Sequence, residues 1–109
     1  MLEKEATEIF AVVLAAGKGT RMKSNRAKVL HTLCGVPMVN YAIQAIRPLV
    51  PERTLVVVGH QASEVKAVLP EDAEPILQVE QLGTGDAVRV AMESIDAEEG
   101  TLLVVNGDG

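Results

Sequence analysis

Aromatic residues are almost absent from this chain of 109 residues: they make up 2% of it, and there is no tryptophan. Aliphatic side chains must therefore fill the core, and the hydrophobic content of 48% provides enough of them for one domain over residues 1–109. The single cysteine, Cys34, excludes an intramolecular disulfide, and no Cys/His cluster indicates a zinc site. The first apolar run, Ile9–Ala16, is too short to span a membrane, and it follows an acidic start. We expect a cytoplasmic protein with no membrane partner.

Acidic residues are missing from positions 9–51, which carry six basic side chains. The remainder of the chain has 15 acidic and four basic residues, so a net charge of −5 hides one strongly basic region. An acidic protein with a single basic region suits a small anionic ligand better than the backbone of a nucleic acid. We therefore expect no nucleic-acid partner.

The basic residues are densest directly after the apolar run, which suits a strand that is buried on both faces. Gly17 and Gly19 then permit a sharp turn that brings backbone N–H groups close to a ligand, and five basic residues fall within positions 18–28. The spacing is not that of the P-loop, and Met22 stands where the dinucleotide fingerprint has its third glycine or alanine. The pattern predicts a different kind of phosphate-binding loop, with an ordinary basic surface loop as the alternative.

Strand and helix patterns alternate along the rest of the chain. The expected strands are Thr54–Val58, Pro75–Val79 and Thr101–Val105, and the expected helices begin at Met38, Ala62 and Gly83 and extend to about Pro48, Leu69 and Ile95. Aliphatic strands separated by helices predict an α/β fold with a mostly parallel sheet and flanking helices. Because the carboxyl ends of parallel strands share one edge, the loop after Ala16, Gln78–Thr84 and Asn106–Asp108 should face one ligand.

These segments resemble the sugar-phosphate nucleotidyltransferases, and in particular the bacterial bifunctional N-acetylglucosamine-1-phosphate uridyltransferase/glucosamine-1-phosphate acetyltransferases. The likeness is carried by LAAGKGTRMKS (Leu14–Ser24), KVLHTL (Lys28–Leu33), GVPM (Gly35–Met38), QVEQLGTG (Gln78–Gly85) and Gly107-Asp108. Three positions depart from the pattern: Ala27 replaces the usual proline, Asp86 stands where histidine is common, and Asn106 stands where some members have tyrosine. The resemblance implies a Rossmann-like, GT-A-like nucleotidyltransferase fold, truncated here at its fourth strand.

The resemblance also implies a reaction, in which UTP and N-acetylglucosamine 1-phosphate give UDP-N-acetylglucosamine and pyrophosphate. Arg21 and Lys28 would be catalytic, and Asp108 would hold Mg²⁺. The substrate-binding residues implied are Leu14, Ala15, Ala16, Gly17, Gly19, Lys28, Gln78, Gln81, Gly83, Thr84, Asn106 and Gly107.

Other polar residues have simpler explanations. Lys18 and Lys23 are as readily solvated loop charges as ligands, and Glu80 suits a helix start or the surface. His31 and His60 have no carboxylate or cysteine at catalytic spacing.

The family's uridyltransferase domain is considerably longer than this chain, and its sugar-binding residues and second metal ligand lie beyond Gly109. The resemblance therefore implies an N-terminal fragment, inactive alone, whose parent is a homo-oligomer through an absent C-terminal domain. Two alternatives stay open: another sugar-phosphate nucleotidyltransferase, and a nucleotide-binding module without catalysis.

Overall fold

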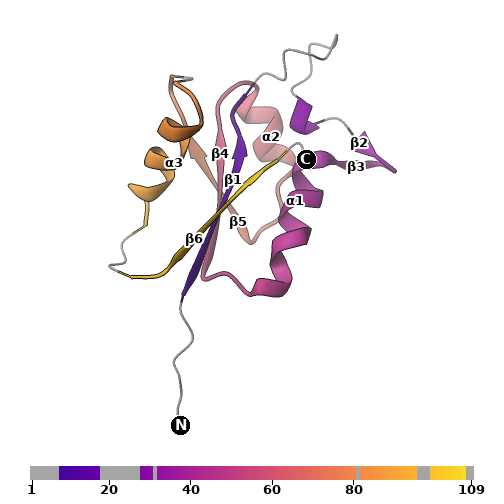
Figure 1. Cartoon of the computed structure of the whole chain (residues 1–109). Coiled ribbons are helices and arrows are strands. Elements are labelled where there is room, and N and C mark those ends of the chain that lie inside the picture. Colours follow the sequence, from indigo (N-terminus) through magenta and orange to yellow (C-terminus); the bar gives the residue numbers. More distant parts are fainter. Residues whose placement is uncertain (1–7, 18–27, 31, 81, 96–98, 108–109) are drawn as a thin grey trace.

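A parallel sheet lies between two layers of helices (Figure 1). The structure is a computed structural model that describes residues 8–17, 28–30, 32–80, 82–95 and 99–107. Its elements are β1 (Ile9–Ala15), η1 (Lys28–Leu30), β2 (Thr32–Leu33), β3 (Val36–Pro37), α1 (Met38–Ile46), η2 (Arg47–Leu49), β4 (Arg53–Val58), α2 (Ala62–Val68), β5 (Ala73–Leu77), α3 (Thr84–Met92) and β6 (Thr101–Asn106). No helix within these described ranges has the length and apolar character needed to cross a membrane.

The order of the strands determines where a ligand can bind. Four strands are paired in parallel in the order β5-β4-β1-β6, so the predicted α/β fold is confirmed. The chain moves outward from β1 to β4 and β5 and then returns to the other side of β1. Right-handed crossovers consequently place α1 and α2 on one face and α3 on the other. The direction of winding reverses between β1 and β6, and α/β proteins bind ligands at the carboxyl ends of strands at such a point.

The central strand, β1, is buried because its small and branched aliphatic side chains serve both faces. Ala11, Val13 and Ala15 contribute to the core beneath α1 and α2. Val12 and Ala16 contribute to a second core beneath α3. The whole β1 segment therefore reads as an unbroken apolar run, as expected for a strand in the centre of a parallel sheet.

The helices follow the predicted periodicity with small shifts at their ends. In α1 the buried residues are Val39, Ile43 and Ile46, at spacings of three and four. The helix α3 ends at Met92 rather than at the predicted Ile95, because the last turn tightens and the Ile95 N–H bonds to the Met92 carbonyl at 3.0 Å.

The third strand of the chain lies two residues earlier than predicted, at Ala73–Leu77 instead of Pro75–Val79. Pro75 lacks an N–H for the ladder, so proline is disfavoured inside a central strand. However, β5 is an edge strand with one unpaired side, where proline is tolerated.

A two-stranded hairpin, β2–β3, was not predicted. Its two-residue turn uses Cys34 and Gly35, which both have positive φ angles of 55° and 81°, and this is the backbone that tight hairpins favour. The hydroxyl of Tyr41 donates to the Leu33 carbonyl at 2.6 Å and so ties the hairpin to α1.

The opposite edge of the sheet is formed by β6. Among the described residues no strand pairs with its outer side, and the side chains of Leu102 and Val104 are 36% and 38% exposed. In the described part of the chain, β6 therefore leaves this side of the sheet open.

Candidate functional site

The carboxyl ends of β1 and β6 are joined through Gly107. Its backbone N–H donates to the Leu14 carbonyl at 2.9 Å. A Cβ at position 107 would lie 3.0 Å from the Leu14 carbonyl oxygen and 3.2 Å from Cγ1 of Val29, so only glycine fits without a shift of these neighbours. Val29 is a buried residue of η1, and Lys28 immediately precedes it. Val29, the neighbour of the predicted catalytic lysine, thus packs beside the end of β6.

A second glycine, Gly59, joins the ends of β1, β4 and β5. A Cβ there would lie 3.2 Å from Cβ of Ala16 and 3.3 Å from the Gln78 carbonyl oxygen. Two backbone hydrogen bonds hold these strand ends together. The His60 N–H donates to the Ala16 carbonyl at 3.1 Å, and the Gln78 N–H donates to the Val58 carbonyl at 2.8 Å. Gly59 therefore lies between Ala16, which precedes the predicted phosphate loop, and the predicted substrate-binding residue Gln78.

Gly59 was missed by the sequence analysis, although a signal was present. It directly follows an aliphatic strand, as Gly17 and Gly107 do, and these three glycines end neighbouring strands at one sheet edge.

The side chain of Gln78 is almost buried, with 4% of the residue exposed. Its Nε2 donates to Oδ2 of Asp86 at 2.8 Å and lies 3.5 Å from the Gly83 carbonyl oxygen. Both hydrogens of the amide nitrogen are therefore directed at acceptors within the protein. No described residue donates a hydrogen bond to its Oε1.

Asp86 connects this glutamine to an arginine on the same helix. Its Oδ1 accepts from Nε and Nη2 of Arg89 at 3.1 and 2.7 Å, while its Oδ2 accepts from Gln78. The hydrogen bond from Gln78, followed by that from Arg89, lowers the pKa of Asp86 below its ordinary value. No motif in the sequence predicted a hydrogen bond between Gln78 and Asp86, because the two residues are eight positions apart.

The start of α3 provides a backbone site next to this group. Gly83 precedes the helix with a φ of 100°, a conformation that favours glycine, and the exposed Thr84 is the first helical residue. The N-terminal end of a helix offers unpaired N–H groups to a ligand.

The remaining predicted site residues are described only by their burial or lie outside the described residues. Leu14 is half-buried, Ala15 and Ala16 are buried, and Gly17 is exposed at the end of the described part of the loop. Gly19, Arg21, Gln81 and Asp108 lie outside the described residues, as does the side chain of Lys28.

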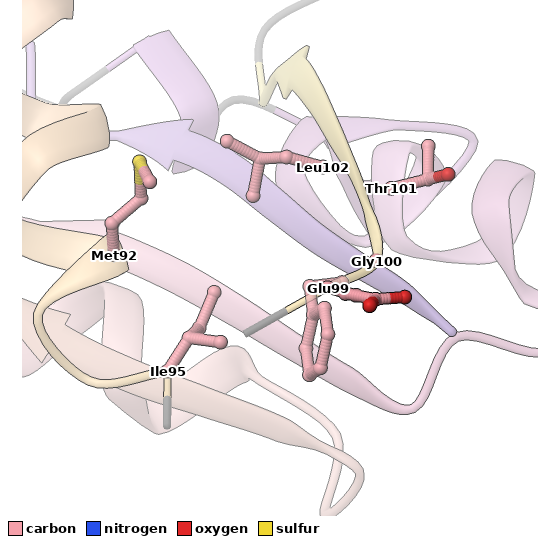
Figure 2. Close-up of a pocket in the computed structure, with 7 residues that line it drawn as sticks. Met92, Ile95, Glu99, Gly100, Thr101 and Leu102 are labelled. Atoms are coloured by element: carbon pink, nitrogen blue, oxygen red, sulfur yellow. The ribbon is translucent and has the colours of Figure 1, made fainter. Parts of the chain in front are cut away.

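Asn106 is at the strand-end edge but lines a different space. It borders an apolar cavity of about 520 Å³ between α1, the hairpin and β6, which shares no lining residue with the Gln78 group. A smaller cavity of about 200 Å³ lies at the opposite end of the sheet, where Met92 and Ile95 lie across from Gly100 to Leu102 (Figure 2). Neither cavity is lined by residues of the predicted phosphate loop.

The described residues contain no group of three or more His, Cys, Asp or Glu side chains that could hold a metal ion. Mg²⁺ commonly binds through one or two carboxylates and completes its shell with substrate phosphates and water. Asp108 directly follows Gly107, which the β1 backbone holds at the strand-end edge. Asp108 itself lies outside the described residues, so its role as a ligand of Mg²⁺ stays a prediction from the sequence.

Comparison with known proteins agrees with this arrangement. The profile of the MobA-like NTP transferase domain family matches residues 11–109. The "Bifunctional protein GlmU" of Rubrobacter xylanophilus is 84% identical over 104 residues, which are 95% of this chain and 22% of that protein. The chain therefore belongs to the MobA-like NTP transferase domain family, and it spans about a fifth of the length of this curated relative.

Solved structures show the same fold. A nucleotidyl transferase from Methanothermobacter superimposes with a TM-score of 0.81 at 25% identity, over 94% of this chain and 51% of that one. A Mycobacterium tuberculosis protein solved as a complex with manganese gives a TM-score of 0.75 at 23% identity, over 95% of this chain and 52% of that one.

Proposed function

We propose that this chain supplies the nucleotide-binding part of an enzyme that transfers a uridylyl group from UTP to N-acetylglucosamine 1-phosphate. The observation that carries the proposal is that the carboxyl ends of all four strands, β5, β4, β1 and β6, meet where the strand order reverses. Gly107 holds the end of β6 against Leu14, and Gly59 holds Gln78 against Ala16. The 84% identity to a bifunctional GlmU protein supports the choice of reaction.

The chemistry divides between two sides of this edge. Phosphoryl and nucleotidyl transfers need positioning and charge neutralisation more than covalent catalysis by the protein. Backbone N–H groups from Ala15 to Gly19 would hold the phosphates of UTP. Arg21 would neutralise the charge that develops on the departing pyrophosphate, and its two-pronged guanidinium suits adjacent phosphate oxygens. Lys28, a compact charge on the first residue of η1, would bring the α-phosphate and the sugar phosphate together.

The uracil would bind on the α3 side of the same edge. Gln78 provides a side-chain hydrogen bond, with Gln81 and the Gly83 N–H in support. Thr84, Asn106 and Gly107 complete the substrate contacts of this proposal.

Mg²⁺, held by Asp108 and the substrate phosphates, would supply a positive charge that neutralises the reacting phosphate oxygens. Arg21, Lys28 and Gln78 are proposed to contact the substrates directly and not to bind the ion.

Two alternatives differ in what the protein does with the nucleotide: another sugar-phosphate nucleotidyltransferase, or a binding module without catalysis. The test is a chimaera in which this chain replaces the matching segment of the Rubrobacter xylanophilus relative. Pyrophosphate release is measured with N-acetylglucosamine 1-phosphate and each of UTP, CTP, GTP and ATP.

We expect release that requires both substrates, with UTP preferred. Lys28→Ala should raise KM for the sugar phosphate, whereas the matched control Lys66→Ala, an exposed lysine of α2, should leave it unchanged. Preference for another nucleotide would favour the first alternative. Binding of UTP without pyrophosphate release would favour the second.

A further inference from the structure

We propose that Asp86 and Arg89 select uracil over cytosine by fixing the orientation of the Gln78 amide. This inference rests on the function proposed above and adds to it two positioning residues that do not themselves touch the base. It starts from the hydrogen bond that joins Nε2 of Gln78 to Oδ2 of Asp86 at 2.8 Å.

The chemistry of that contact leaves the amide one orientation. A carboxylate is only an acceptor, so the amide group facing it must be the NH₂ donor. The Gly83 carbonyl oxygen, 3.5 Å from the same nitrogen, favours the same orientation. The oxygen Oε1 is then the atom left for a ligand, since no described residue donates to it.

An amide with a fixed orientation discriminates between pyrimidines, but a freely rotating amide does not. Uracil presents a donor at N3–H, which a glutamine oxygen can accept. Cytosine presents an acceptor at N3, which would face the lone pairs of that oxygen. A rotating glutamine could turn its NH₂ toward cytosine and restore a hydrogen bond, so the free-energy cost of the turned orientation sets the specificity.

Arg89 provides the second part of the arrangement. Its Nε and Nη2 both donate to Oδ1 of Asp86, at 3.1 and 2.7 Å, so the two carboxylate oxygens have different partners. The Asp86 side chain is only 15% exposed. An aspartate is ionised at neutral pH, and the hydrogen bonds from Gln78 and Arg89 lower the Asp86 pKa further, so the carboxylate only accepts. Asp86 therefore presents a fixed acceptor to Gln78.

The substitution Asp86→Asn tests this logic with almost no change of shape. The arginine still requires an acceptor, so the new amide should turn its oxygen to Arg89 and its NH₂ to Gln78. Gln78 must then rotate, present Oε1 to that NH₂ and direct its own NH₂ toward the base. The substitution should weaken the preference for UTP and improve the use of CTP.

The expected size follows from the strength of the contact. A hydrogen bond to a charged group changes an equilibrium by about 10- to 100-fold. We therefore expect the ratio of kcat/KM for UTP to that for CTP to fall by about 10- to 100-fold in the Asp86→Asn chimaera, a change of about 1.4–2.8 kcal/mol. Asp86→Ala releases the amide without reversing it, so the ratio should fall less. Adding Arg89→Ala to Asp86→Asn should recover part of the preference, because the asparagine can then turn either way.

The control is Glu64→Gln, which neutralises an acidic residue at the third position of α2, as Asp86 is at the third position of α3. The substitution removes the same charge from the first turn of a different helix, so it controls for the effect on helix stability. Because Asp86, and not Glu64, is the partner of Gln78, the ratio should stay unchanged within about twofold. A general loss of folding or of helix stability would lower kcat/KM for both nucleotides and leave their ratio unchanged.

Two failures are distinguishable. If the unmodified chimaera transfers no nucleotide or does not prefer UTP, the proposed function is wrong and this inference falls with it. If it prefers UTP but Asp86→Asn leaves the ratio within about twofold, only the inference is overturned. Should Asp86→Asn not fold, an unchanged ratio in Asp86→Ala overturns it equally, and a lowered ratio supports it.

Discussion

Gly107 should be the position in the strand-end edge least able to accept a side chain. In the substitution Gly107→Ala, the new Cβ would lie 3.0 Å from the Leu14 carbonyl oxygen, 3.2 Å from Cγ1 of Val29 and 3.4 Å from Cγ1 of Val13. The first of these neighbours is backbone of the central strand and cannot rotate away. The backbone at Gly107 must therefore shift outward, which lengthens its 2.9 Å hydrogen bond to Leu14.

Two terms give the magnitude. Adding a methyl group to a filled site costs about 1–3 kcal/mol, and the weakened hydrogen bond costs about 0.5–1.5 kcal/mol. We expect the free energy of unfolding to fall by about 2–4 kcal/mol in total. At a denaturant slope of about 2 kcal/mol per M, the urea midpoint should fall by about 1–2 M.

The assay is urea unfolding of the 109-residue chain, followed by far-ultraviolet circular dichroism. The matched control is Gly85→Ala, because a Cβ at Gly85 meets no atom within 4 Å and the residue lies in the helix α3. That variant should be as stable as the unmodified chain or more stable by up to about 1 kcal/mol. A Gly107→Ala midpoint within about 0.2 M of the unmodified chain would refute the reasoning about this contact.

Two further predictions concern other parts of the fold. Gly100→Ala should lower the urea midpoint by a similar amount, since its φ is 147° and the new Cβ would lie 2.9 Å from Cε2 of Phe10; an unchanged midpoint would contradict it. Arg53 donates to Glu74 at 2.6 and 3.0 Å and lowers the Glu74 pKa. The pair should stabilise the fold above the ordinary glutamate pKa, and this contribution should be lost as the pH falls through the lowered value. Melting temperatures between pH 7 and 3 should therefore fall less steeply in Glu74→Gln than in the control Glu71→Gln, and equal slopes would argue against the pair.

The sheet could be predicted because its strands carry their own signals. The run at Ile9–Ala15 is apolar on both faces, and Val39, Ile43 and Ile46 repeat at helical spacing, so local patterns and tertiary burial agree. The predicted position of β5 was two residues too late. Whether Pro75 can lie inside the strand depends on whether that strand is at an edge of the sheet. That property belongs to the assembled sheet.

The sequence predicted which residues lie at the candidate site but not the hydrogen bonds between their side chains. Motif spacing indicated Gln78 and Gly107, and the structure places both at the same sheet edge. A free glutamine amide could offer a ligand both a donor and an acceptor. In the structure the nitrogen is bonded to Asp86, so only the oxygen is left. A pairing between a residue after β5 and one inside α3 depends on how the helix packs, and no local pattern encodes it.

The central claim is that the predicted phosphate loop stabilises the departing pyrophosphate. Substitution of Arg21 tests this claim most directly. Arg21 lies outside the described residues, so this expectation comes from the sequence. The measurement is kcat for pyrophosphate release by the chimaera at saturating UTP and sugar phosphate. The account predicts that Arg21→Ala lowers kcat by about 10²–10⁴ and that Arg21→Lys recovers little, because one ammonium cannot replace the guanidinium fork. A kcat for Arg21→Ala within about twofold of the unmodified chimaera would contradict the claim.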